Sequence, residues 1–146
     1  EVSGRSVIFD ATHNAEGALG LDENISKLVN ERGAKPWIVA GTLGEERAAA
    51  LMSVVGKWAQ GVVLVRPTQP RACPLEVLEL ALPQSFCGEI RRSTVKDLFS
   101  ARGELLLGEP SDTVLVTGSI YLVGEIMALM GGQPSPGKLG ALQDWV

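Results

Sequence analysis

The sequence is poor in the residues that build disulfide-rich, zinc-binding and nucleic-acid-binding proteins. Its 146 residues include two cysteines, Cys73 and Cys87, and one histidine, too few for a disulfide framework or a zinc site. Lysine and arginine number 13 against 17 acidic residues, and the resulting formal charge of -4 disfavours binding to nucleic acid or to an anionic membrane. No apolar run reaches the ~18 residues that span a bilayer, and no signal peptide is evident. We therefore expect a cytoplasmic chain with free thiols.

Several catalytic motifs are also missing. The sequence contains no Gly-x-x-x-x-Gly-Lys-Ser/Thr phosphate loop, no Gly-x-Ser-x-Gly nucleophile elbow and no cluster with metal-ligand spacing. We therefore expect neither a P-loop, nor a hydrolase triad, nor a resident metal within this chain. The first residue is Glu1 rather than Met, which leads us to expect a piece of a longer protein.

Most of the sequence consists of short apolar segments that alternate with longer segments in which apolar residues recur at helical spacing. The chain is 45% hydrophobic but only 5% aromatic. We expect strands over residues 5–10, 36–41, 61–66, 89–92 and 113–117, and helices over 16–32, 45–58, 74–82, 94–107 and 120–130. Such alternation implies parallel strands joined by right-handed crossovers. The sequence thus predicts one three-layer, Rossmann-like α/β domain with a mostly parallel sheet over residues 1–130, and a flexible Gly/Pro linker and tail over 131–146.

The first predicted strand runs directly into polar residues: Asp10, then His13 and Asn14. The carboxyl ends of strands are where open α/β sheets bind ligands. There a carboxylate can accept hydrogen bonds from ribose hydroxyls, an imidazole can donate to phosphate, and Asn14 can cap the following helix. The pattern is equally compatible with a structural interpretation, in which Asp10 and Asn14 cap a turn and His13 lies on the surface.

Three further segments fall at the same predicted edge. Thr117-Gly118-Ser119 follows the last strand, where a glycine allows close approach of a ligand and the hydroxyls can contact a phosphate or carboxylate. The alternative is that Gly118 makes the turn and Ser119 caps the helix. Gly41-Thr42-Leu43-Gly44 ends the second strand. Arg71, in the loop after the third, either holds an anion or is simply solvated.

Two of these segments resemble the folylpolyglutamate synthase / dihydrofolate synthase family of the Mur ligase superfamily. Asp-Ala-Thr-His-Asn-Ala, at residues 10–15, is similar to the Asp-Gly-Ala-His-Asn-Pro that opens the family's C-terminal domain. Thr-Gly-Ser-Ile-Tyr-Leu-Val-Gly-Glu, at 117–125, is similar to its Thr-Gly-Ser-Leu-Tyr-Leu-Val-Gly-Glu. Pro-Arg-Ala at 70–72 and Gly-Thr-Leu at 41–43 match shorter segments. The chain departs at Glu45-Glu46-Arg47, where the family often has Asp-Lys-Asp.

The resemblance implies the C-terminal domain of an ATP-dependent amide ligase that adds L-glutamate to folate through an acyl phosphate, with dihydropteroate as a second candidate substrate. It assigns ATP contacts to Asp10, His13 and Asn14, and weaker substrate-cleft contacts to Arg71, Gly118 and Ser119. The P-loop and the ligands of Mg²⁺ would belong to an N-terminal domain, so the chain alone is expected to be inactive. Two alternatives stay open: a Rossmann-like interaction module without catalysis, and a domain of a Mur-type cell-wall peptide ligase.

Overall fold

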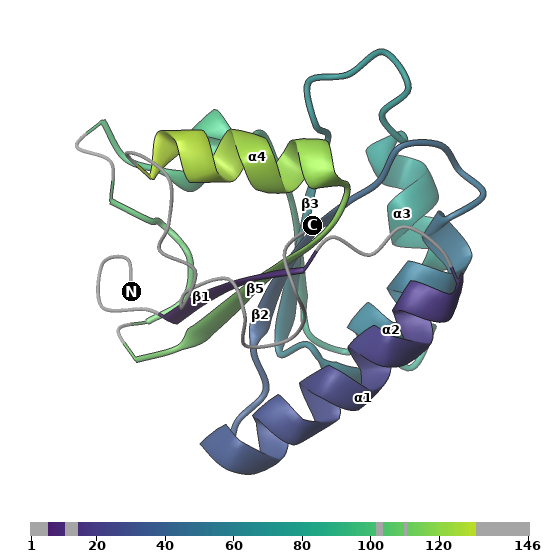
Figure 1. The fold of residues 1–146 in the computed structure, drawn as a ribbon, viewed down its shortest axis with the longest axis vertical. Helices are drawn as coiled ribbons and strands as arrows, with labels where there is room; N and C mark the ends of the chain where they lie inside the picture. Colours follow the sequence, from purple (N-terminus) through teal and green to yellow (C-terminus); the bar gives the residue numbers. More distant parts are fainter. Residues whose placement is uncertain (1–5, 11–14, 102–103, 110, 131–146) are drawn as a thin grey trace.

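A five-stranded sheet, with every strand pairing parallel, forms the centre of the molecule (Figure 1). The computed structural model describes residues 6–10, 15–101, 104–109 and 111–130. The strands are β1 (Ser6–Asp10), β2 (Trp37–Gly41), β3 (Gly61–Val65), β4 (Glu89–Ser93) and β5 (Thr113–Gly118), in the spatial order β1-β5-β2-β3-β4. The helices are α1 (Ala15–Arg32), α2 (Ala48–Trp58), α3 (Leu75–Ala81) and α4 (Ile120–Leu129), with a 3-10 turn η1 (Lys96–Leu98). The predicted α/β class is therefore confirmed.

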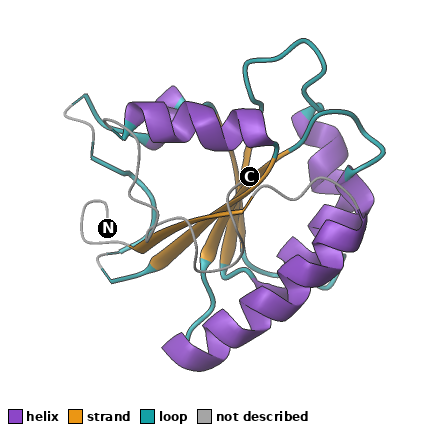
Figure 2. Cartoon of the chain, in the orientation of Figure 1, coloured by secondary structure: helices purple, strands orange, loops and turns teal. Residues whose placement is uncertain are grey.

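Helices cover both faces of the sheet, which makes three layers (Figure 2). Successive residues of a strand point to opposite faces, so Ile38 and Ala40 pack with α1, α2 and α3, whereas Trp37 and Val39 pack with α4. The inner strands are buried on both sides, which explains why they are continuous apolar runs rather than alternating ones.

Helix α1 forms where the periodicity predicts it. Leu21, Ile25 and Leu28 recur at helical spacing and are buried against the sheet. Gly33 ends the helix with a φ of 71° and donates its N–H to the carbonyl of Val29. No helix in the described residues is both long and apolar enough to cross a bilayer.

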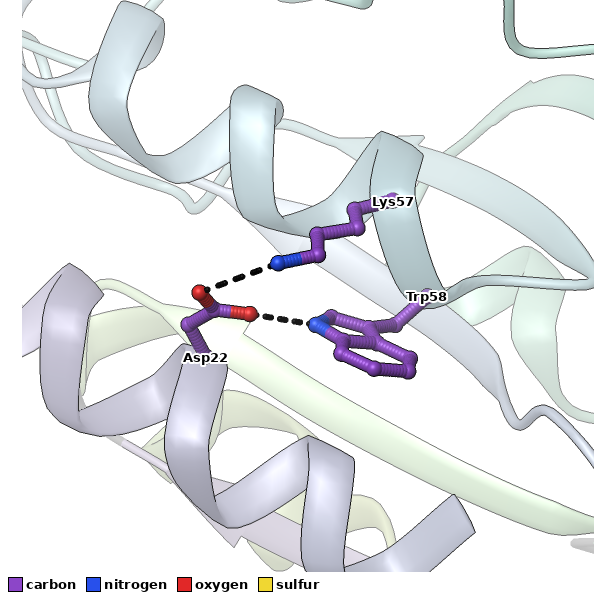
Figure 3. A network of polar contacts seen from close by, with 3 residues as sticks. All are labelled: Asp22, Lys57 and Trp58. Carbon is purple, nitrogen blue, oxygen red and sulfur yellow. Dashed lines mark hydrogen bonds and ion pairs between the residues drawn. The ribbon is translucent and has the colours of Figure 1, made fainter.

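A polar network joins α1 to α2 on their outer surface (Figure 3). Asp22 of α1 accepts a hydrogen bond from the indole N–H of Trp58 and pairs with the ammonium of Lys57 at 3.4 Å. The Lys57 ammonium also lies 5.2 Å from the centre of the Trp58 ring. Because Lys57 is exposed, its ion pair with Asp22 contributes little to stability. The hydrogen bond from the Trp58 indole is the contact that holds α1 against α2.

The segment between β4 and β5 contradicts the sequence prediction. We predicted a single helix over residues 94–107. The described residues instead show the short turn η1 and then an antiparallel bridge between Phe99 and Leu105. Leu106 is 53% exposed and donates its N–H to the carbonyl of Leu98. Pairing across this turn satisfies the backbone without a helix, and residues 102–103 lie outside the described part of the chain.

The remaining differences concern element ends. Helix α2 begins at Ala48 rather than at Glu45, because Gly44 adopts a φ of 81° and the Ala48 N–H closes a turn onto the carbonyl of Glu45. Strand β4 lies at an edge, as its polar sequence predicts. The predicted linker and tail over 131–146 lie outside the described residues.

Candidate functional site

Three neighbouring strands end together at one edge of the sheet. Strand β1 ends at Asp10, β5 at Gly118 and β2 at Gly41. The chain continues from β1 and β2 into the layer of α1 and α2, but from β5 into α4 on the opposite face. Open α/β sheets bind ligands at such an edge, where neighbouring connections diverge to opposite faces. The topology therefore places the candidate site at the carboxyl ends of β1, β5 and β2.

Asp10 is the acidic group of this edge. It is 1% exposed and lies in register with Thr117 of β5, which is fully buried. The hydroxyl Oγ1 of Thr117 donates to Oδ2 of Asp10 at 3.3 Å. Asp10 and the Thr117-Gly118-Ser119 bend therefore lie together at this edge, whereas their convergence with His13 stays a prediction. His13 and Asn14 lie outside the described residues.

Gly118 and Ser119 shape the start of α4. Gly118 has a φ of 117°, and a Cβ placed there would lie 2.0 Å from the carbonyl oxygen of Gly41. The Ser119 N–H donates to that same oxygen at 2.8 Å, and its side chain accepts the Tyr121 N–H at 3.0 Å. This is the structural interpretation of the motif, a tight turn and a helix cap. Among the described residues the Ser119 hydroxyl donates to no acceptor, and its contact with a ligand stays a prediction.

The loops after β2 and β3 lie side by side, which brings Arg71 to the site. The Gly44 N–H donates to the carbonyl of Arg71, and the Cys73 N–H to the carbonyl of Thr42, both at 2.8 Å. Arg71 is exposed, and within the described part of the chain its guanidinium forms no ion pair. Sequence reasoning treated these two loops as separate signals. Their pairing is long-range, and no local pattern reveals it.

Cys73 is a structural residue of this junction. Both cysteines are free, as predicted. Burial raises the pKa of the Cys73 thiol above its usual value, and the nearby carboxylates of Glu45, Glu46 and Glu76 act in the same direction. A hydrogen bond with the side chain of Thr42 opposes them. The thiol therefore stays neutral, which does not suit a nucleophile.

Sequence reasoning gave Glu125 no role, yet it connects α4 to the same edge. Its Oε2 accepts the N–H of Thr68, in the loop between β3 and α3, at 2.8 Å. The one available signal was its place at the end of the nine-residue segment that resembles the ligase family.

The edge suits binding better than bond-breaking chemistry. From β1 to β3 it spans three strand spacings, about 14 Å, which matches an elongated ligand. The buried Asp10 lies at one end of this edge, and the exposed Arg71 lies toward the other. Among the described residues no three His, Cys, Asp or Glu side chains gather to hold a metal ion. These features define a Rossmann-like domain with a candidate ligand-binding edge.

Comparisons with known proteins identify solved structures that share this fold. No protein-family model and no curated relative matches the sequence. Among solved structures, the bifunctional folylpolyglutamate synthase/dihydrofolate synthase of Yersinia pestis, complexed with AMPPNP and Mn ion, is similar at a TM-score of 0.66 and 21% identity, over 88% of this chain and 30% of that one. FolC of E. coli, in complex with DHPP and ADP, gives 0.67 and 23%, over 89% and 30%. Folylpolyglutamate synthase of Thermotoga maritima gives 0.66 and 21%, over 94% and 31%.

At this identity the likeness shows the fold. The chain has the fold of one part of the folylpolyglutamate synthase structures and spans about 30% of their length. The fold implied by the two sequence segments is therefore confirmed.

Proposed function

We propose that this chain is the C-terminal domain of a cytoplasmic, ATP-dependent ligase that joins L-glutamate to folate. The observation that carries the proposal is the meeting of Asp10 with the Thr117-Gly118-Ser119 bend at the ligand-binding edge. These two segments are the ones whose sequences resemble the ligase family. Further support comes from the shared fold, since the similar structures include complexes with AMPPNP and ADP.

The reaction has two steps. A carboxylate oxygen of the folate attacks the γ-phosphorus of ATP, which gives an acyl phosphate and releases ADP. The amino group of L-glutamate then attacks the acyl carbon, phosphate leaves, and the nitrogen loses a proton to form the amide. Magnesium would screen the phosphate charge, and by the resemblance to the ligase family its ligands, with the P-loop, would belong to an N-terminal domain.

The residues of this chain would bind and orient the reactants. Asp10 would act with His13 and Asn14 at the nucleotide, where a charge-assisted hydrogen bond contributes about 1.5–3 kcal/mol. Arg71 would attract a substrate carboxylate. Gly118 allows close approach of a ligand, and Ser119 supplies a hydroxyl donor. Each role raises the rate by positioning groups rather than by forming bonds.

The test compares the full-length gene product with the 146-residue chain. We expect ADP formation that requires both folate and L-glutamate from the former, and none from the latter. In the full-length protein His13→Ala should raise the KM for ATP or lower kcat, whereas Glu31→Ala, an exposed change on α1, should do neither. Absence of glutamate-dependent ADP formation would overturn the proposal, and unchanged kinetics of His13→Ala would remove that residue from the site.

A further inference from the structure

A carboxylate of α4 holds the loop that carries Arg71. Oε2 of Glu125 accepts the Thr68 N–H at 2.8 Å, across 57 residues of sequence. Figure 1 shows the β3–α3 loop and the N-terminal end of α4 at the same end of the strands. The bond therefore links the layer of α4 to a loop that leads into the opposite layer.

Arg71 lies between two anchors of this loop. Toward its start the loop is held by Glu125 through Thr68, and toward its end the carbonyl of Arg71 accepts the Gly44 N–H. Between them, Pro70 directly precedes Arg71, and two turns close around the stretch: the Gln69 N–H donates to the carbonyl of Pro67, and the Ala72 N–H to the carbonyl of Gln69. The fixed φ of Pro70 and these two turns leave the stretch from Thr68 to Arg71 few torsions with which to absorb a displacement. A shift at Thr68 is therefore transmitted to Arg71.

The charge of Glu125 is unusual for its helix. It is the only charged residue of α4, whose sequence is Ile-Tyr-Leu-Val-Gly-Glu-Ile-Met-Ala-Leu. Its neighbours Leu122, Val123 and Ile126 form the buried face, while Glu125 is half-buried. A carboxylate in that position adds little to packing, and its bond to the loop is the contact that accounts for it.

We propose that Glu125 is a positioning residue, which fixes Thr68 so that the guanidinium of Arg71 stands at the ligand-binding edge. The inference rests on the proposed function for the ligand of Arg71, an anionic carboxylate of the incoming substrate. The fixing of the loop itself does not depend on that function. Glu125 touches no reactant, so its loss should weaken substrate binding without slowing the bond-forming steps.

The first experiment tests the hold on the loop. Hydrogen–deuterium exchange is followed by mass spectrometry in the full-length gene product, on peptides that cover residues 66–73. Glu125→Ala should speed exchange of this segment on the order of tenfold, because the Thr68 amide loses its acceptor. Glu125→Gln keeps a side-chain oxygen and should restore most of the protection. Glu31→Ala, which removes an exposed helical carboxylate elsewhere, should change nothing. Unchanged exchange in Glu125→Ala would overturn the proposal.

The second experiment tests whether Glu125 acts through Arg71. The KM values for L-glutamate and for folate, and kcat, are measured for Glu125→Ala, Arg71→Ala and the double variant. Glu125→Ala should raise, by about fivefold, the same KM that Arg71→Ala raises, with kcat within twofold of wild type. The double variant should match Arg71→Ala, because the two changes share one mechanism. Glu125→Gln should stay near wild type.

The other possible outcomes of these two experiments contradict either the positioning role of Glu125 or the proposed function. Additive effects, an equal fall in kcat, or an Arg71→Ala variant with both KM values unchanged would overturn the positioning role. A wild-type protein without ligase activity would contradict the proposed function instead, and the exchange rates of residues 66–73 would still decide whether Glu125 holds the loop.

Discussion

Thr117 Oγ1 lies 3.3 Å from Asp10 Oδ2 and joins the ends of β5 and β1 across 107 residues of sequence. The contact follows from the register of the two strands, which pairs Asp10 with Thr117. A slip of one residue would turn one of the two side chains to the other face of the sheet. The geometry of the candidate site is therefore set by how β5 inserts between β1 and β2.

Removing the hydroxyl of Thr117 should destabilise the fold. Thr117→Val keeps the shape but leaves the buried carboxylate without this donor, at a cost of about 1.5–3 kcal/mol. Thr113→Val, in the same strand, is the matched control, because Thr113 is also buried but has no side-chain bond of this kind among the described residues. Urea unfolding of the two variants measures the difference. Equal free energies of unfolding would contradict a structural role for the Thr117–Asp10 bond.

Gly118 should tolerate no side chain. Gly118→Ala places a Cβ 2.0 Å from the carbonyl oxygen of Gly41, in a backbone conformation with a φ of 117°. We expect a loss of about 3 kcal/mol or more in the free energy of unfolding. Gly124→Ala is the control, since a Cβ there meets nothing within 4 Å and alanine favours a helix by about 1 kcal/mol. A Gly118→Ala variant as stable as wild type would show that the strand end can shift.

The order of elements was predictable because local patterns dictate it. The apolar run of β2, the helical spacing of Leu21 and Ile25, and the stop at Gly33 are each readable within one segment. Asp10 and Gly118 could also be assigned to one edge, because parallel strands share their carboxyl ends. The register that pairs Asp10 with Thr117 could not be predicted, since it depends on β5 inserting between β1 and β2.

Long-range contacts account for what the sequence did not reveal. The backbone bond from Gly44 to Arg71, and the bond from Thr68 to Glu125, join segments whose sequences give no sign of the contact. The helix predicted over 94–107 failed for a different, local reason. Its apolar residues fit a helical stripe, but pairing of Phe99 with Leu105 across a short turn satisfied the backbone instead.

The two cysteines should react at very different rates. Cys87 is exposed, whereas Cys73 is buried and its pKa is raised by that burial. A thiol-specific disulfide reagent at pH 8 should label Cys87 quickly and Cys73 only as fast as the fold opens. The raised pKa means that the folded state favours the neutral Cys73 thiol. This preference contributes fully to folding stability below the pKa of the thiol in the unfolded chain. The contribution is lost as the pH rises through the pKa of the thiol in the folded protein. The variants Cys87→Ser and Cys73→Ser assign each kinetic phase, and rapid labelling of Cys73 in the folded protein would contradict its burial.

Substitutions of Leu106 and Leu107 can distinguish the observed turn before β5 from the helix that the sequence predicted over residues 94–107. Leu107 is 1% exposed and packs in the core under α4, whereas Leu106 is 53% exposed. Leu107→Ser should therefore cost about 3–5 kcal/mol of unfolding free energy, and Leu106→Ser no more than about 0.5 kcal/mol. A helix with Leu106 on its inner side would give a large cost for Leu106→Ser instead. Chemical unfolding of the two single variants separates these cases, and a larger loss for Leu106→Ser would restore the helical interpretation.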